Sequence, residues 1–416
     1  MNNAVWREVD SQLGRRTEEL EELVFALVAH DSQIPPFGDE REIAGFLTAA
    51  LAELGLPAPT RPACDPRRPN LVVTVPGAGP TQRRRLLLCG HVDTKPVGDA
   101  AHLWRTDPLT ATVVGERVYG LGISDMKASV AAMMMALAAI GAGGVQLVDD
   151  VVLALVADEE AGARYGSKYL APLLAPTVDA ALIGEPSGWT RDWEGIHLVS
   201  RGLCCFKVHV NGTQMHSSLS DRMPSVNANL EMARLILDLQ AELAASPAFR
   251  RDGDLVATAN IAVTTGGGVF YGVVPGAAWF GCDLRLVPGQ TEAEIRELLE
   301  DWALRKTAAG PAQVSIEYDD VLAWIPSASL SRSHPLVDAA VDATRTVLGE
   351  PPPLSMFPGT TDAPWWEQAG VPTLPSLGPG ILTYCHGPNE FVNRAAIGQA
   401  ARIYARILLG YCGVVP

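Results

Sequence analysis

The chain has 416 residues, of which 48% are hydrophobic and 19% are charged. This length allows two or three domains with a large core, and the composition excludes a disordered or fibrous protein. A formal net charge of -15 argues against a nucleic-acid partner, because phosphate binding depends on a basic surface. Seven cysteines without a framework spacing are expected to be reduced thiols in the cytoplasm.

The sequence predicts neither a secretory signal nor a membrane span. The first ten residues include Arg7, Glu8 and Asp10 and have no apolar core. The most apolar stretch, residues 130–140, is too short to cross a bilayer and lies within a helical pattern. We therefore expect a cytoplasmic protein without a membrane partner.

The first half of the chain shows strands that alternate with helices. Helices are predicted at 18–30, at 40–54 and after Lys127, and strands at 71–75, 85–89, 113–119, 150–156 and 180–183. The helix after Lys127 is apolar nearly all round, which predicts burial. This alternation predicts an α/β fold, a doubly wound mixed sheet with both faces covered.

The pattern changes near residue 196. A strand at 198–210, a helix at 226–244, strands at 256–265 and 277–286, a helix at 292–306 and a strand at 313–318 follow in order. The order β-α-β-β-α-β predicts a ferredoxin-like α+β domain. Because the α/β pattern resumes at Pro335, we expect a catalytic domain made of residues 1–197 and 325–416 and an inserted lid and dimerisation domain at 198–324.

Acidic and imidazole side chains stand at the ends of apolar runs throughout the first domain. These residues are His91, Asp93, Asp125, Glu159, Glu160, Glu185 and His386. An open α/β sheet gathers its chemistry at the carboxyl ends of its strands. Imidazole nitrogens and carboxylate oxygens without a thiolate suit a catalytic divalent ion, with Zn most expected and Co or Mn as alternatives.

Two ions with one bridging carboxylate would account for five of these residues. Asp125 is the candidate bridge, which leaves His91 with Glu185 on one ion and Glu160 with His386 on the other.

The two remaining acidic residues then have other roles. Glu159 is left as the general base beside the activated water, and Asp93 is expected to orient His91 through its other ring nitrogen.

Each motif also has an ordinary structural interpretation. A His-x-Asp pair is commonly a turn or a cap, adjacent glutamates are commonly a solvated helix start, and His386 alone would be a surface loop residue. The recurrence at successive strand ends favours the metal site over these alternatives.

Five segments together resemble a known family. They are 90–94, 120–127, 158–160, 184–186 and 385–390. They are similar to the acetylornithine deacetylase, succinyl-diaminopimelate desuccinylase, aminoacylase and glutamate carboxypeptidase family of two-metal hydrolases. The resemblance covers nearly the whole chain and implies the ligand and base assignment above. It also implies a cis peptide between Asp125 and Met126, and a homodimer formed through the inserted domain.

The resemblance also implies substrate-facing residues in and near the inserted domain. His216 matches a histidine that reaches from a partner subunit to stabilise an oxyanion. Arg285 matches a position that holds a substrate carboxylate, Asn260 is a second candidate for that pocket, and Thr360 lies in a loop that lines the far side of the substrate. The alternatives are a hydrogen-bonded loop histidine and an exposed strand arginine.

The chain departs from the family pattern at positions that concern the substrate. Gly272 stands where relatives usually carry an asparagine, and Trp365 and Trp366 follow the Thr-Asp loop. The Trp pair, with Phe270 and Tyr271, would enlarge or flatten the pocket for an aromatic substrate, although core packing is the commoner role of such residues.

These observations predict a metal-dependent hydrolase that deacylates a small N-acyl amino acid or a dipeptide-like amide. An alternative is hydrolytic deamination or amide cleavage of a non-peptide substrate, including an aromatic amine that bears a carboxylate. An alternative of another class is a catalytically inactive binding paralogue, which would require a missing ligand or base.

Overall fold

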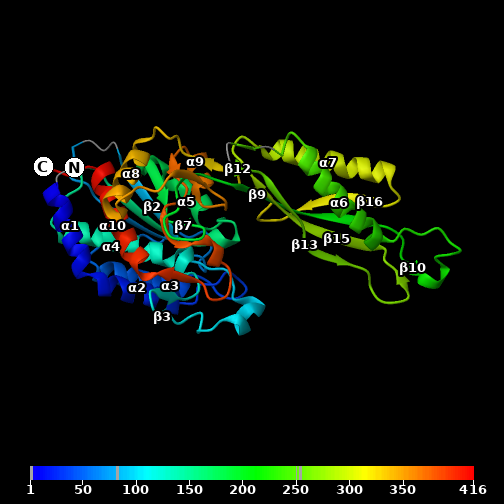
Figure 1. Ribbon diagram of the computed structural model, residues 1–416, viewed down its shortest axis with the longest axis horizontal. Coiled ribbons are helices and arrows are strands. Elements are labelled where there is room, and N and C mark those ends of the chain that lie inside the picture. The colour runs from blue at the N-terminus through cyan, green and yellow to red at the C-terminus, as the bar shows by residue number, and fades with distance from the viewer. Residues whose placement is uncertain (1–2, 81–83, 250, 253–254) are drawn as a thin grey trace. The chain divides into compact units, whose positions relative to one another are not determined.

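The computed structural model describes residues 3–80, 84–249, 251–252 and 255–416 (Figure 1). The chain divides into two compact units. The first contains the residues up to Ser200, Ala328–Phe357 and Thr361–Pro416, and the second contains Arg201–Ser327 and Pro358–Thr360. The first unit is therefore assembled from both ends of the chain, with the second inserted between them.

A five-stranded mixed sheet forms the centre of the first unit, in the order β1-β5-β2-β6-β19. Its strands are β1 (Leu71–Val75), β2 (Leu86–His91), β5 (Val151–Val156), β6 (Ala180–Ile183) and β19 (Thr373–Leu374). β1 pairs antiparallel with β5, whereas β2, β5, β6 and β19 pair in parallel. Every residue of β2, β5 and β6 is buried, as expected for a sheet covered on both faces.

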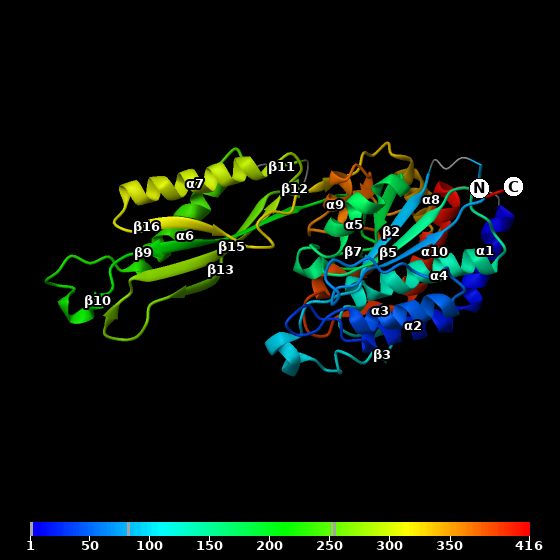
Figure 2. The same ribbon diagram turned by 180° about the vertical axis from the view of Figure 1, so that it is seen from behind.

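Helices cover both faces of this sheet, and Figure 2 shows α4 (Ala128–Ala142) on one side and α5 (Ser167–Leu174) and α9 (Ala363–Gln368) on the other. α4 packs in turn against α1 (Asn3–Arg15), α2 (Thr17–Ala29) and α10 (Arg394–Tyr411). The segment Ile123–Ala142 is long and apolar enough to cross a membrane, but it is buried within the unit. Its apolar surface is therefore occupied by the protein core.

Smaller elements complete the first unit. They are α3 (Arg41–Glu53), α8 (Pro335–Leu348), the sheet β17-β8-β18 (Ala328–Ser329, Ile196–Ser200, Leu354–Phe357), the pair β20-β7 (Gly378–Ile381, Pro186–Gly188) and the sheet β21-β4-β3 (Phe391–Asn393, Arg117–Tyr119, Thr112–Val114).

The second unit is a four-stranded antiparallel sheet with two helices. The strands are β9 (Gly202–Asn211), β13 (Thr258–Gly267), β15 (Ala277–Leu286) and β16 (Gln313–Tyr318), in the order β13-β15-β9-β16. The helices α6 (Ala228–Ala245) and α7 (Glu292–Ala309) enclose the core with Phe206, Phe280 and Trp302. The predicted order β-α-β-β-α-β and the α/β fold class are thus both confirmed.

Two predicted strands were wrong, and a helix near the start of the chain was not predicted. The strand expected at 198–210 is two strands, β8 and β9, which belong to different units and are separated by Arg201. The strand expected at 113–119 is the hairpin β3-β4, which turns at Gly115 with φ of 59°. Helix α1 was not predicted, although the buried pair Val9 and Leu13 has the i, i+4 spacing of a helix face.

The second unit offers a matched test of its core within one helix. In α7, Leu299 is fully buried, whereas Leu304 is 70% exposed. Leu299→Ala is expected to lower the free energy of unfolding by about 2–5 kcal/mol, because it leaves a cavity. Leu304→Ala is expected to change it by less than about 0.5 kcal/mol. Urea unfolding of both variants measures the difference, and equal effects would contradict the placement of this helix.

Candidate active site

The predicted site residues of the first unit come from the ends of three parallel strands and from two loops. His91 is the last residue of β2, Glu159 and Glu160 follow β5, and Glu185 follows β6. Parallel strands present their carboxyl ends at the same edge of a sheet. Residues that follow these strands in the sequence are therefore brought together at one edge of the sheet.

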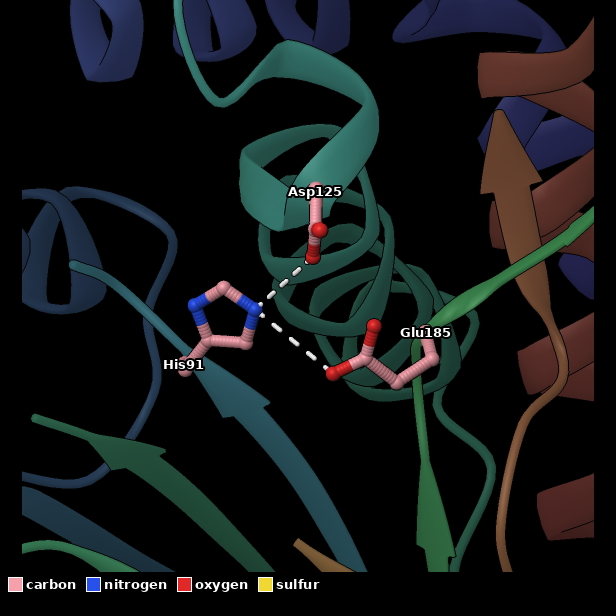
Figure 3. A group of neighbouring side chains, drawn as sticks. All are labelled: His91, Asp125 and Glu185. Carbon is pink, nitrogen blue, oxygen red and sulfur yellow. Dashed lines mark hydrogen bonds and ion pairs between the residues drawn. The ribbon is translucent and has the colours of Figure 1, made fainter. Parts of the chain in front are cut away.

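One group of side chains lies around His91 (Figure 3). Its Nε2 atom is 3.0 Å from Oδ1 of Asp125 and 3.6 Å from Oε1 of Glu185. All three residues are buried, and their potential ligand atoms lie within 4.8 Å of one another. The arrangement has the spacing of a three-ligand metal site.

A second group lies around His386 and shares Asp125 with the first. The Nε2 atom of His386 is 3.1 Å from Oδ2 of Asp125 and 3.1 Å from Oε1 of Glu160. These ligand atoms also lie within 4.8 Å of one another. Asp125 thus directs one carboxylate oxygen to each histidine, which is the geometry of a bridging ligand.

The electrostatics of the two groups fit a pair of cations. Burial, reinforced by the Asp125 carboxylate, raises the pKa of Glu185 well above its usual range, and its Oε1 atom is buried without a hydrogen-bond partner among the described residues. His386 is half-exposed, and partial burial would lower its pKa, but Glu160 and Asp125 raise it. Oxygen and imidazole donors with this excess of negative charge suit Zn, Co or Mn.

A buried glutamate, Glu390, fixes the loop that carries Asp125. Its carboxylate accepts the main-chain N–H groups of Gly122 (2.9 Å), Ser124 (2.8 Å) and Asp125 (3.1 Å). The peptide between Asp125 and Met126 is cis, as the family resemblance implied. Sequence reasoning gave Glu390 no role, although it ends the segment that carries His386.

Asp93 acts on two neighbours in different ways. The Nδ1 atom of His91 lies 3.0 Å from the main-chain oxygen of Asp93 and 3.7 Å from its Oδ1, so the hydrogen bond that orients the ring goes to the main chain. The Asp93 carboxylate accepts the N–H groups of Glu159 (3.2 Å) and Glu160 (3.0 Å). The contact expected between the Asp93 carboxylate and the imidazole is therefore made by the main chain instead.

Glu159 lies beside the two groups but in neither of them. Burial of its carboxyl group raises its pKa well above the usual range, and the nearby His91 opposes this. A carboxyl group with a raised pKa beside groups that could hold a metal ion is a candidate for proton transfer.

Two further residues near the ligands were missed by sequence reasoning. Nζ of Lys95 lies 3.1 Å from Oε2 of Glu160 and also donates to the main-chain oxygen of Glu160. Asp362 is 1% exposed, burial raises its pKa to about 7, and neither of its carboxylate oxygens has a hydrogen-bond partner among the described residues. Asp362 ends the Gly-Thr-Thr-Asp segment, which is the only signal that could have indicated it.

His216 belongs to the second unit, where β10 (Met215–His216) pairs with β14 (Val273–Val274). Its Nδ1 atom accepts the main-chain N–H of Ser218 at 3.2 Å and lies 2.8 Å from the Ser218 hydroxyl. Because Nδ1 is an acceptor, the neutral ring carries its proton on Nε2. That nitrogen is therefore a hydrogen-bond donor.

Arg285, Asn260 and Thr360 also lie in the second unit. Arg285 forms a two-point ion pair with Asp283, at 2.9 Å for each contact, and its Nη1 atom is 3.4 Å from Oγ1 of Thr360. Asn260 is exposed and pairs with Asp283 across β13 and β15. The structure therefore groups these residues together, and it gives Arg285 an acidic partner that the sequence did not indicate.

The aromatic residues that suggested an aromatic substrate differ in their exposure: two are buried and two are exposed. Trp366 is fully buried and donates to Oγ of Ser167 at 3.2 Å, and Trp365 is 6% exposed, so both are core residues. Phe270 and Tyr271 are 78% and 93% exposed, at the chain segment that leads into β14.

Comparison with known proteins gives a family, two curated relatives and a matching structure. Residues 87–410 match peptidase family M20/M25/M40. The chain is 28% identical over 381 residues to an acetylornithine deacetylase of Photorhabdus laumondii, covering 89% of this chain and 90% of the relative. It is 24% identical over 439 residues to an N-formyl-4-amino-5-aminomethyl-2-methylpyrimidine deformylase of Halalkalibacterium halodurans, covering 98% of each chain.

The fold is shared with the dipeptidase Dug1p of Saccharomyces cerevisiae, with a TM-score of 0.77, 15% identity and 98% of each chain covered. The family match spans most of the sequence and includes all of the strand ends described above. The chain therefore belongs to peptidase family M20/M25/M40 and is a hydrolytic enzyme that acts on amide bonds.

Proposed function

We propose that the protein is a two-metal amidohydrolase that removes an acyl group from a small N-acyl amino acid or a dipeptide-like amide. The observation that carries the proposal is the Asp125 carboxylate, whose two oxygens face His91 and His386. The proposed ligands are Asp125 as the bridge, His91 with Glu185, and Glu160 with His386. Two divalent ions at these groups, most simply Zn but also Co or Mn, would activate water and polarise the amide carbonyl.

Three side chains then have separate roles in the reaction. Glu159 removes a proton from the attacking water and delivers it to the leaving amine, for which its raised pKa is suited. His216, from a partner subunit, stabilises the developing oxyanion with a hydrogen bond from its Nε2–H group and keeps its proton. Asp93 keeps Nε2 of His91 directed at the ligand cluster and holds the loop of Glu159 in place.

The two curated relatives support removal of an acyl group and differ in the group that leaves. One is named as a deacetylase of an ornithine derivative and the other as a deformylase of an aminopyrimidine. We propose Arg285, Asn260 and Thr360 as substrate-binding residues, with Arg285 shared between Asp283 and a substrate carboxylate. The exposed Phe270 and Tyr271 favour a second candidate, hydrolysis of a non-peptide aromatic substrate that bears a carboxylate.

We further propose a cytoplasmic homodimer without a nucleic-acid partner, formed through the second unit. β13 is an edge strand of its sheet, and the adjacent helix α6 exposes Leu230 (59%) and Leu237 (68%). An edge strand and exposed apolar side chains together form a surface suited to pairing with a second copy.

The two adjacent glutamates are expected to give opposite phenotypes. Glu159→Ala should retain both metal ions and lose about 10²–10⁴-fold in kcat, because it removes the general base. Glu160→Ala should lose metal at the His386 group, because it removes a ligand. Metal analysis and steady-state kinetics on the same preparations measure both effects. If Glu159→Ala stayed fully active, the assigned base would be wrong.

Substrate profiling separates the two candidate functions. N-acetyl and N-formyl amino acids should be hydrolysed with a higher kcat/KM than aromatic amines or aromatic N-acyl compounds that bear a carboxylate. Arg285→Met should raise KM for carboxylate-bearing substrates and leave neutral amides unaffected, because only the former use the guanidinium. A preference for the aromatic series would favour the second candidate.

The proposed dimer can be tested with two substitutions of the same type. Leu237→Glu on α6 should convert the dimer into a monomer, because it places a charge in the proposed interface. Leu304→Glu on α7, at a similarly exposed position, should leave the dimer intact. Sedimentation velocity gives the oligomeric state, and a monomeric native protein would refute this interface.

A further inference from the structure

The loop of Asp158, Glu159 and Glu160 is held by its main chain. Asp158 has a φ of 69°, a left-handed conformation that is unfavourable for a residue with a side chain. Each of the three successive N–H groups nevertheless donates to a buried carboxylate: that of Asp158 to Glu40 at 3.3 Å, and those of Glu159 and Glu160 to Asp93 at 3.2 and 3.0 Å. Carboxylates of residues outside the loop, Glu40 and Asp93, therefore fix its main chain.

Arg68 joins the two acidic residues at the start of this loop. Its Nη1 atom lies 3.0 Å from Oδ1 of Asp158, and its Nε and Nη2 atoms form a two-point pair with Glu40. The second oxygen of Asp158 accepts the N–H of Tyr165 at 2.9 Å. The Arg68 guanidinium thus links two carboxylates: that of Glu40, which accepts the N–H of Asp158, and that of Asp158 itself.

The three charged groups of this network are almost completely buried. Glu40 is 0% exposed, Asp158 2% and Arg68 4%. A buried ion pair is a weak source of stability, because desolvation offsets much of the Coulombic attraction. A well-attested use of such groups is to specify one geometry over others. Here the residue that the network contacts directly is Asp158, which immediately precedes Glu159.

The network makes its direct contacts at the Asp158 end of the loop. Asp93 accepts the N–H groups of Glu159 and Glu160, so Glu160 has a support that does not pass through Asp158. The charges of Arg68 and Glu40 also act on Asp93, but without a hydrogen bond to it among the described contacts. Asp158, immediately before Glu159, has its N–H on Glu40 and its carboxylate on Arg68. Loss of the Arg68 guanidinium is therefore expected to affect first Asp158, the residue next to Glu159.

We propose that Arg68 and Glu40 are positioning residues for the general base: through Asp158 they set the direction of the Glu159 carboxylate toward the attacking water. This inference rests on the proposed function, in which Glu159 is that base. Neither residue is part of the two ligand groups. Their effect should appear in kcat, with substrate and metal binding preserved.

The test uses the metal-loaded enzyme and its best N-acyl substrate. Arg68→Met keeps an unbranched side chain that fills the space of the aliphatic part of arginine and removes the guanidinium, and kcat should fall about 10–100-fold, as is typical when a supporting residue of a metal site is lost. KM and the bound metal per chain should remain at their native values. Loss of metal in parallel with kcat would overturn the inference, because the network would then support Glu160.

Two further variants control for folding and for the loss of an arginine. Arg68→Lys keeps the charge but lacks a guanidinium that spans both carboxylates, so its kcat should lie between those of the native enzyme and Arg68→Met. Arg406→Met removes an arginine that is 8% exposed and paired with Asp342 between α10 and α8, and it should leave kcat unchanged. If Arg68→Met fails to fold, Arg68→Lys decides the test: a kcat equal to that of the native enzyme would overturn the inference.

A double substitution links the effect to Glu159. Residues that act through one another have non-additive effects, so Arg68→Met should cause no further loss of kcat in the Glu159→Ala background. A further loss as large as that of Arg68→Met alone would overturn the positioning role. Full activity of Glu159→Ala would instead overturn the proposed base, whereas an inactive Glu159→Ala with a fully active Arg68→Met would overturn this inference alone.

Discussion

The site depends on one carboxylate placed between two imidazoles. The oxygens of Asp125 lie 3.0 Å from Nε2 of His91 and 3.1 Å from Nε2 of His386. Glu185 lies 3.6 Å from the same nitrogen of His91, and Glu160 lies 3.1 Å from the same nitrogen of His386. Buried carboxylates repel one another and lose their hydration, so such a cluster is stable only with compensating positive charge. This requirement explains why the residues suit a pair of cations and why their supports matter.

Main-chain N–H groups provide the supports for this cluster. Three of them converge on Glu390 to fix the loop of Asp125, and two converge on Asp93 to fix the loop of Glu159 and Glu160. The two acceptors are themselves buried, so each of these hydrogen bonds is shielded from water. The loops that carry these candidate ligands are thereby held in place by hydrogen bonds, although they lie at strand ends rather than within regular elements.

The second unit contributes groups of a different kind. Its core is apolar and ordinary for a small sheet with two helices, whereas its polar candidates are exposed or half-exposed. The hydrogen bonds at His216 determine which nitrogen carries its proton, and Asp283 compensates the charge of Arg285. A substrate carboxylate that binds Arg285 therefore has to share the guanidinium with Asp283, which favours selection by geometry over simple charge attraction.

The sequence by itself determined the alternation of strands and helices in the first unit, the α/β class, the insertion of a β-α-β-β-α-β segment and the residue types at the strand ends. These features follow from periodicity and from short spacings, which a single chain displays directly. It did not indicate the break at Arg201, where two strands that read as one run belong to different units.

Only the tertiary structure decided which oxygen faces which nitrogen, that the main chain of Asp93 orients His91, and that Glu390 and Arg68 hold the ligand loops. Glu390 reaches Gly122 across 268 positions of the sequence, and Arg68 lies 90 positions from Asp158. Such contacts are set by the packing of distant segments, and a local pattern of residues carries no record of them.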